Sequence, residues 1–149
     1  MDENPKLLES SDDVAAAVRA IRVAAVLGMK DGSDPEAAAW RIPQMLRERG
    51  IGVIPVNPKF EIIGGERCYP SLAAIPAPYD TLDVFRAPKF IAGIAGEILA
   101  LPPERRPRLV WLQLGIRDDL AAARLAAAGI QVVQDRCLGV DAVRFRPEP

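Results

Sequence analysis

Short apolar runs alternate along the chain with longer stretches in which apolar residues recur at helical spacing. The first run ends at Gly28 and the second at Asn57-Pro58. Runs of this length that are nearly continuous are typical of strands buried on both faces. We expect strands at residues 22–27, 51–56, 81–85, 109–112 and 131–134.

The stretches between these runs predict helices. Ser10 or Ser11 can cap a first helix, and Pro35 suits the first position of a second one. Pro43 interrupts the second pattern, so we expect a kink or a late start to its regular part. The tail at residues 141–145 stays unassigned. We expect helices at residues 11–20, 35–49, 71–75, 89–100 and 118–128.

Strands that alternate with helices at this spacing favour parallel pairing through right-handed crossovers. The sequence therefore predicts an α/β fold, a Rossmann-like doubly wound parallel sheet of about five strands with helices on both faces. We expect residues 1–21 to form an acidic segment and a helix packed on the domain, and residues 22–149 to form the domain itself. In such sheets ligands bind beyond the carboxyl ends of the strands, where the strand order changes direction.

Composition narrows the classes of function. The 149 residues are 50% apolar and 26% charged, and the formal net charge is -1, so we expect neither a nucleic-acid nor a membrane partner. The acidic start MDENPKLLESSDD does not resemble a secretory signal, and we expect a cytoplasmic protein. The chain has two cysteines and no histidine, which disfavours a zinc site and histidine-dependent catalysis.

The turn after the first strand is the first candidate for ligand contact. Gly28, Lys30, Gly32 and Ser33 lie where free backbone N–H groups and a helix dipole can bind a phosphate. The glycine spacing is GxxxG rather than GxGxxG, and glycine is also the ordinary residue for a tight turn.

The end of the second strand carries Val56, Asn57, Pro58 and Lys59. A dinucleotide fold of the NAD type has an acidic residue here for the ribose hydroxyls. Lysine disfavours NAD and suits a phosphate on the ribose, as in NADP or coenzyme A. A solvated Lys59 and simple turn chemistry at Asn57-Pro58 are the alternatives.

The later strand ends add further candidates. Phe85 and Arg86 follow the third strand, where the planar guanidinium can hold a pyrophosphate or can pair with Asp80 or Asp83. Candidates after the fourth and fifth strands are Gln113, Leu114, Gly115 and Cys137.

Two other conspicuous features have structural interpretations. Trp111 lies inside a strand, so we expect it in the core rather than in contact with a ligand. The basic run at residues 104–108 precedes the fourth strand, so we expect a solvated loop at the edge opposite the site.

The strand-end segments resemble those of the small stand-alone CoA-binding proteins, which are similar to the CoA-binding domain of the succinyl-CoA synthetase α subunit. The resemblance runs from about Val23 to Cys137. It implies that coenzyme A binds with its phosphates near Gly28–Ser33 and its adenosine near Val56–Lys59. The rest of the ligand would lie along the ends of the third and fourth strands. The resembling segments are VNPK (56–59), GERCYP (65–70), VFR (84–86), WLQLGI (111–116) and VVQDRCL (132–138).

The leading interpretation is a module or subunit that binds coenzyme A or an acyl-CoA without catalysis of its own, with a protein partner possible. The alternative is an NADP-dependent oxidoreductase or an acyl-CoA ligase-type enzyme subunit that needs a partner chain. The resemblance does not carry the ligase reaction, because that reaction uses a phosphorylated histidine in a different domain of the synthetase. A third hypothesis makes Cys137, next to Arg136, form a mixed disulfide with the CoA thiol.

Overall fold

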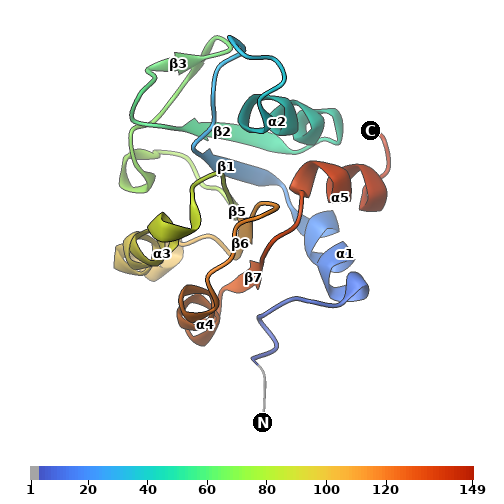
Figure 1. Cartoon of the computed structure of the whole chain (residues 1–149), viewed down its shortest axis with the longest axis vertical. Coiled ribbons are helices and arrows are strands. Elements are labelled where there is room, and N and C mark those ends of the chain that lie inside the picture. The colour runs from blue at the N-terminus through green and yellow to red at the C-terminus, as the bar shows by residue number, and fades with distance from the viewer. Residues whose placement is uncertain (1–3) are drawn as a thin grey trace.

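A five-stranded parallel sheet forms the centre of the protein (Figure 1). The computed structural model describes residues 4–149, so residues 1–3 of the predicted acidic segment lie outside the described part of the chain. The sheet order is β2-β1-β5-β6-β7, and every neighbouring pair is parallel. The predicted fold class is confirmed. The strands are β1 (Val23–Leu27), β2 (Gly52–Val56), β5 (Thr81–Val84), β6 (Leu109–Leu112) and β7 (Gln131–Val133).

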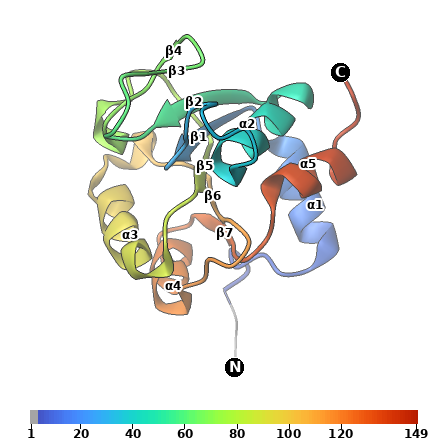
Figure 2. The same cartoon turned by 45° about the horizontal axis from the view of Figure 1, so that its top comes forward.

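Helices cover both faces of this sheet (Figure 2). One face carries α1 (Ser11–Ala20), α2 (Ala38–Glu48) and α5 (Leu138–Phe145), whose buried residues form one core with Val26 and Trp111. The other face carries α3 (Ile91–Ala100) and α4 (Asp119–Ala127). Trp111 is fully buried, as expected, and its Nε1 donates to the Arg136 carbonyl at 2.7 Å. Short 3₁₀ turns lie at Leu72–Ala74, Pro88–Phe90 and Pro103–Arg105.

The chain changes direction across the sheet at β1. After β1 it crosses over through α2 to β2 on one side, and it then returns to pair β5 on the other side of β1. A crevice therefore opens between the carboxyl ends of β1 and β5. This is the place at which the doubly wound fold positions a ligand.

Helix α2 begins at Ala38, so the predicted start at Pro35 is wrong. The Asp34 side chain accepts a hydrogen bond from the Glu36 N–H at 3.1 Å and holds a turn, and Ala37 is extended. The helix continues through Pro43, which has no N–H for the carbonyl four residues earlier. The Lys30 N–H instead donates to that Ala39 carbonyl at 3.1 Å, so the loop after β1 is fastened to α2.

Two elements were not predicted. Strands β3 (Ile62–Ile63) and β4 (Glu66–Arg67) form an antiparallel hairpin in the segment expected to be a loop. Gly64 and Gly65 turn it with φ of 57° and 81°, a pair of left-handed residues that few other residue types adopt. The second is α5, which occupies the unassigned tail because its apolar face packs against α1 and α2.

The basic run 104–108 lies at the amino edge of the sheet, as expected, but its side chains are not simply solvated. The Arg105 Nη2 donates to the Ile75 carbonyl at 2.6 Å, and the Arg106 Nη2 donates to the Leu99 carbonyl at 2.8 Å. These arginines fasten loops and cap the end of α3.

Arg146 fastens the carboxyl end of the chain in the same way. Its Nη1 donates to the carbonyls of Val18 at 2.9 Å and Ile21 at 2.8 Å, which lie at the end of α1. Its Nε donates to the Arg49 carbonyl at 3.1 Å, just after α2. One side chain therefore donates hydrogen bonds to backbone carbonyls at the ends of two helices.

Replacement of Arg146 by alanine is expected to lower the free energy of unfolding by about 2 kcal/mol, because several carbonyls lose a charged donor. Urea titration followed by circular dichroism measures the change. Arg144→Ala is the matched control, since Arg144 is exposed and its guanidinium lies over the Phe145 ring without an ion pair in the described structure. Equal losses in the two variants would contradict the capping role.

Candidate functional site

Two cavities lie at the carboxyl edge of the sheet, on either side of the contact between β1 and β5. We name them the α2 cavity, of about 540 Å³, and the α3 cavity, of about 300 Å³. Gly28 and Arg86 line both. The other lining residues of the α2 cavity are Lys30, Ala37, Ala38, Ala39, Arg41, Ile42, Phe85, Ala87, Gln113, Leu114, Ile116 and Cys137. Those of the α3 cavity are Leu27, Pro58, Pro70, Ser71, Leu72, Phe90, Gly93, Ile94 and Glu97.

Gly28 makes the junction between the cavities possible. Its φ is 87°, and its N–H donates to the Val56 carbonyl at 2.8 Å. A Cβ at this position would lie 2.4 Å from the Phe85 carbonyl oxygen, closer than real Cβ atoms approach. Only glycine lets the β1 and β5 ends come this close.

The amino end of α2 forms one wall of the α2 cavity. The helix has no side-chain cap at Ala37, and within residues 4–149 the N–H groups of Ala38 and Ala39 make no hydrogen bond. Free N–H groups and the positive end of the helix dipole favour an anion at this wall.

The charged side chains around the α2 cavity are all cationic. Lys30, Arg41 and Arg86 line it without any aspartate or glutamate, and none of the three has an ion-pair partner within residues 4–149. The Arg86 guanidinium stacks 4.3 Å from the centre of the Phe90 ring rather than pairing with Asp80 or Asp83. The cavity therefore has a positive potential that suits phosphate.

In the glycine turn after β1, the side chains of Asp31 and Ser33 are bound to each other. The Asp31 carboxylate accepts hydrogen bonds from the Ser33 N–H at 3.1 Å and the Ser33 Oγ at 2.6 Å. These bonds lower the pKa of Asp31 and leave a carboxylate in the loop. Gly32 packs against the ring of Trp40. Gly32 and Ser33 lie outside both cavities, whereas Gly28 lines both and Lys30 lines the α2 cavity.

The end of β2 is a structural turn. The Asn57 Nδ2 donates to the Met29 carbonyl at 2.9 Å, and its Oδ1 accepts from the Lys59 N–H at 2.9 Å. Asn57 thereby ties the loop after β1 to the loop after β2, and Val56 is fully buried beside it. Of this segment only Pro58 lines a cavity; Lys59 is exposed and lies outside both.

A buried carboxyl lies beneath the α2 cavity. Asp83 in β5 is fully buried, and its Oδ1 accepts from the Gln113 Nε2 at 2.6 Å. Its Oδ2 has no hydrogen-bond partner in the described structure. Burial raises the pKa of Asp83 to about 7, although the bond from Gln113 opposes the shift. An aspartate that titrates near neutrality beside a cavity is an unusual feature for a sheet centre.

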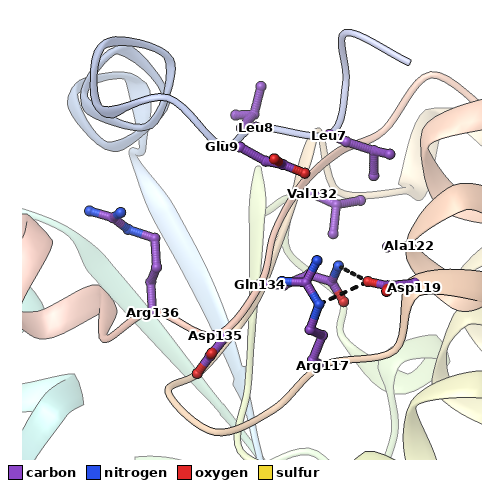
Figure 3. A pocket seen from close by; sticks show the side chains of 10 residues that line it. All are labelled: Leu7, Leu8, Glu9, Arg117, Asp119, Ala122, Val132, Gln134, Asp135 and Arg136. Carbon is purple, nitrogen blue, oxygen red and sulfur yellow. Dashed lines mark hydrogen bonds and ion pairs between the residues drawn. The ribbon is translucent and has the colours of Figure 1, made fainter. Parts of the chain in front are cut away.

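A third pocket, of about 470 Å³, lies beside β7 at the edge of the sheet (Figure 3). Three of its polar side chains are bound to one another: Asp119 Oδ1 lies 2.9 Å from the Arg117 Nε and 3.1 Å from the Gln134 Nε2. Asp135, which has a positive φ of 56°, holds the Gly115 N–H at 2.6 Å. Gly115 therefore contributes its N–H to this loop, and it lines neither the α2 cavity nor the α3 cavity.

Strand-end reasoning missed the residues that come from helices and turns. Arg41 and the free N–H groups of α2 were missed because the helix start was placed too early. In the α3 cavity, Gly28, Pro58 and Arg86 follow sheet strands and were predicted. Other lining residues were missed because they lie in turns or on α3 rather than after a sheet strand: Ser71, Leu72, Phe90, Gly93, Ile94 and Glu97. Cys137 lines the α2 cavity, but the neighbouring Arg136 is bound to Asp141 at 2.7 Å and points its charge there.

The chain is similar to known proteins in sequence. A family model described as "CoA binding domain" matches residues 22–142. The uncharacterized protein YneT of Bacillus subtilis (strain 168) is 30% identical over 116 residues, which are 78% of this chain and 82% of that protein. None of the described helices is long and apolar enough to cross a membrane.

Solved structures match as well. The protein called cell-free ID.343 from Thermus thermophilus is 40% identical with a TM-score of 0.81, and the match covers 92% of this chain and 99% of that one. The dinucleotide forming acetyl-coenzyme A synthetase 1 of Ca. Korarchaeum cryptofilum matches with a TM-score of 0.62 at 16% identity, over 82% of this chain and 27% of the longer one. The second likeness shows a shared fold.

Gly28→Ala is expected to lower the free energy of unfolding by about 3 kcal/mol or more, because left-handed strain adds to a clash with backbone that cannot move aside. Gly129→Ala is the matched control: its φ is 85°, but no atom lies within 4 Å of an added Cβ. Chemical denaturation of both variants measures the difference. A loss at Gly28 no larger than at Gly129 would show that the β1–β5 contact is not tight.

The buried Asp83 predicts a pH-dependent stability. Its pKa rises from 3.8 to about 7 on folding, so the folded state holds the proton more tightly and stability falls as pH rises through this window. Between pH 5 and pH 7 the loss is on the order of 2–3 kcal/mol. Urea titrations at several pH values should show this slope in the wild type and a reduced slope in Asp83→Asn. Parallel slopes would sink the assignment.

Proposed function

The chain belongs to the CoA-binding domain family, and on this premise we propose that it binds coenzyme A or an acyl-CoA across the carboxyl ends of β1 and β5. The observation that carries the proposal is the cationic α2 cavity, with three cations that no described carboxylate pairs and a helix end whose N–H groups are free. The additional likeness to the succinyl-CoA synthetase α subunit stays a prediction.

The phosphates of the ligand fit the middle of the site. Coenzyme A has a charged pyrophosphate between its adenosine 3'-phosphate and its uncharged pantetheine arm, and Gly28 and Arg86 line both cavities. We assign the pyrophosphate to the free N–H groups of Ala38 and Ala39, with Lys30 and Arg86 as cationic partners.

The α3 cavity suits the adenosine. Pro58, Pro70, Leu72 and Ile94 give it apolar walls that match the faces of a purine, and Ser71 and Glu97 offer polar groups at its rim. Lys59 is exposed near Pro58, and its proposed partner is the phosphate on the ribose.

This placement puts the pantetheine arm in the α2 cavity. Beyond the cations this cavity is lined by Ile42, Phe85, Leu114 and Ile116, with Gln113 as a buried polar group. An uncharged arm with two amides and a terminal sulfur fits such a mixed wall. Residues 22–149 supply all of these contacts, while α1 packs against α5 behind the site.

We propose a binding role rather than a catalytic one. The groups that line the cavities suit phosphate and apolar surface. The hydroxyl and thiol among them belong to Ser71 and Cys137, and neither forms a side-chain hydrogen bond to a base in the described structure. A role as a subunit beside a catalytic partner chain is compatible with the same site. Binding of NADP in place of coenzyme A would instead favour the oxidoreductase alternative.

Calorimetric titration with coenzyme A, acetyl-CoA and NADP tests the proposal. Coenzyme A is expected to bind, and Arg41→Ala is expected to weaken it about tenfold because a cation at the phosphate wall is lost. Arg47→Ala is the matched control from the same helix, since Arg47 pairs with Glu66 outside both cavities. No heat from coenzyme A at millimolar concentration, or equal weakening in both variants, would overturn the proposal.

A further inference from the structure

Gln113 is the buried polar side chain of the α2 cavity. It is 3% exposed and follows β6, and its Nε2 is used in the 2.6 Å bond to the Asp83 Oδ1. Within residues 4–149 its Oε1 accepts no hydrogen bond. Because the side chain lines the cavity, this oxygen is the group that Gln113 offers to a ligand.

Asp83 decides how the Gln113 amide is turned. In the sheet register Asp83 lies between Val26 and Trp111, on the face covered by α2 and α5. An ionised carboxylate only accepts hydrogen bonds, so it holds the Gln113 NH₂ toward itself and the amide oxygen away. A protonated carboxyl has an O–H that can donate to the amide oxygen, and in that arrangement the NH₂ group turns toward the cavity.

Asp83 has no ion-pair partner among the described residues. From α5, Asp141 faces Arg136 and is bound to it; from β6, the Trp111 N–H is bound to the Arg136 carbonyl. From α2, Arg41 lines the same cavity as Gln113, as do Lys30 and Arg86, but none of these three cations is bound to Asp83 in the described structure. Gln113 is therefore the one partner of Asp83 among the described residues, and the proton on Asp83 is set by burial and by this bond.

We propose that Asp83 is a positioning residue that sets, through its own protonation, whether Gln113 presents a hydrogen-bond acceptor or a donor to the end of the pantetheine arm. The inference rests on the proposed function, since it requires that arm to lie in the α2 cavity. It adds to that function a way in which the protein distinguishes the free thiol of coenzyme A from the thioester of an acyl-CoA.

The two ligand forms differ in the group that meets Gln113. The free thiol has an S–H that can donate, whereas a thioester has a carbonyl oxygen that only accepts. With Asp83 ionised, the Gln113 oxygen favours the thiol and repels the thioester carbonyl. With Asp83 protonated, the NH₂ group favours the thioester. The protein therefore prefers free coenzyme A at alkaline pH and loses that preference in acid.

Calorimetric titrations of coenzyme A and acetyl-CoA between pH 5.5 and pH 8 test this. The measured quantity is the ratio of the two dissociation constants, because both ligands carry the same phosphates and the titration of those phosphates cancels. In the wild type the preference for coenzyme A is expected to be about tenfold at pH 8 and to fall at least threefold by pH 5.5.

Asp83→Asn is expected to make the ratio independent of pH, whereas Asp12→Asn, which removes an exposed carboxylate on α1, should behave like the wild type. Gln113→Leu is a second variant that should also abolish the pH dependence, and the wild-type profile is decisive even if neither variant folds. A wild-type ratio that does not change with pH overturns the inference but leaves the proposed function intact. Absence of binding by either ligand at every pH would instead remove the proposed function.

Discussion

The close contact between the ends of β1 and β5 is the constraint on which the site depends. The Phe85 carbonyl oxygen lies where any Cβ on residue 28 would have to be, so the chain must leave β1 as a left-handed glycine. From that point it turns toward α2, while the chain after β5 turns toward α3. Two cavities open on either side of one narrow junction, and Gly28 and Arg86 belong to both. A ligand with a charged centre and two bulkier ends matches this arrangement.

Strand-end logic brings several predicted residues to the two cavities, because parallel strands place their carboxyl ends at one edge of the sheet. Gly28, Arg86, Gln113 and Cys137 reach the cavities for that reason. The same logic failed at Ser33, where a local bond to Asp31 takes the hydroxyl out of the site. Such competition between neighbouring side chains leaves no periodic signal in a sequence.

The sequence pattern did not predict the true start of α2 or the hairpin, because both depend on local contacts. A turn held by the Asp34 side chain delays the helix, and the Lys30 N–H binds the carbonyl that Pro43 leaves free. The helix therefore begins without a capping side chain, and its free N–H groups face the cations. In the hairpin, the two-residue strands are too short for an alternating pattern.

Asp83 shows a feature that stability alone does not account for. A carboxyl whose Oδ2 is unpartnered in the described structure lowers stability above its pKa, and an apolar side chain would pack this part of the sheet at less cost. Its hydrogen bond to Gln113 connects the buried sheet centre to the cavity wall. Asp83 therefore lowers the stability of the fold, and it also orients the buried amide of Gln113 in the site.

A crystal structure of the protein with coenzyme A bound is the most direct measurement of the central claim. The account predicts the pyrophosphate within hydrogen-bond distance of the Ala38 and Ala39 N–H groups, the adenosine in the α3 cavity and the sulfur arm beside Gln113. Coenzyme A bound in the pocket beside β7, or with its phosphates away from α2, would contradict it.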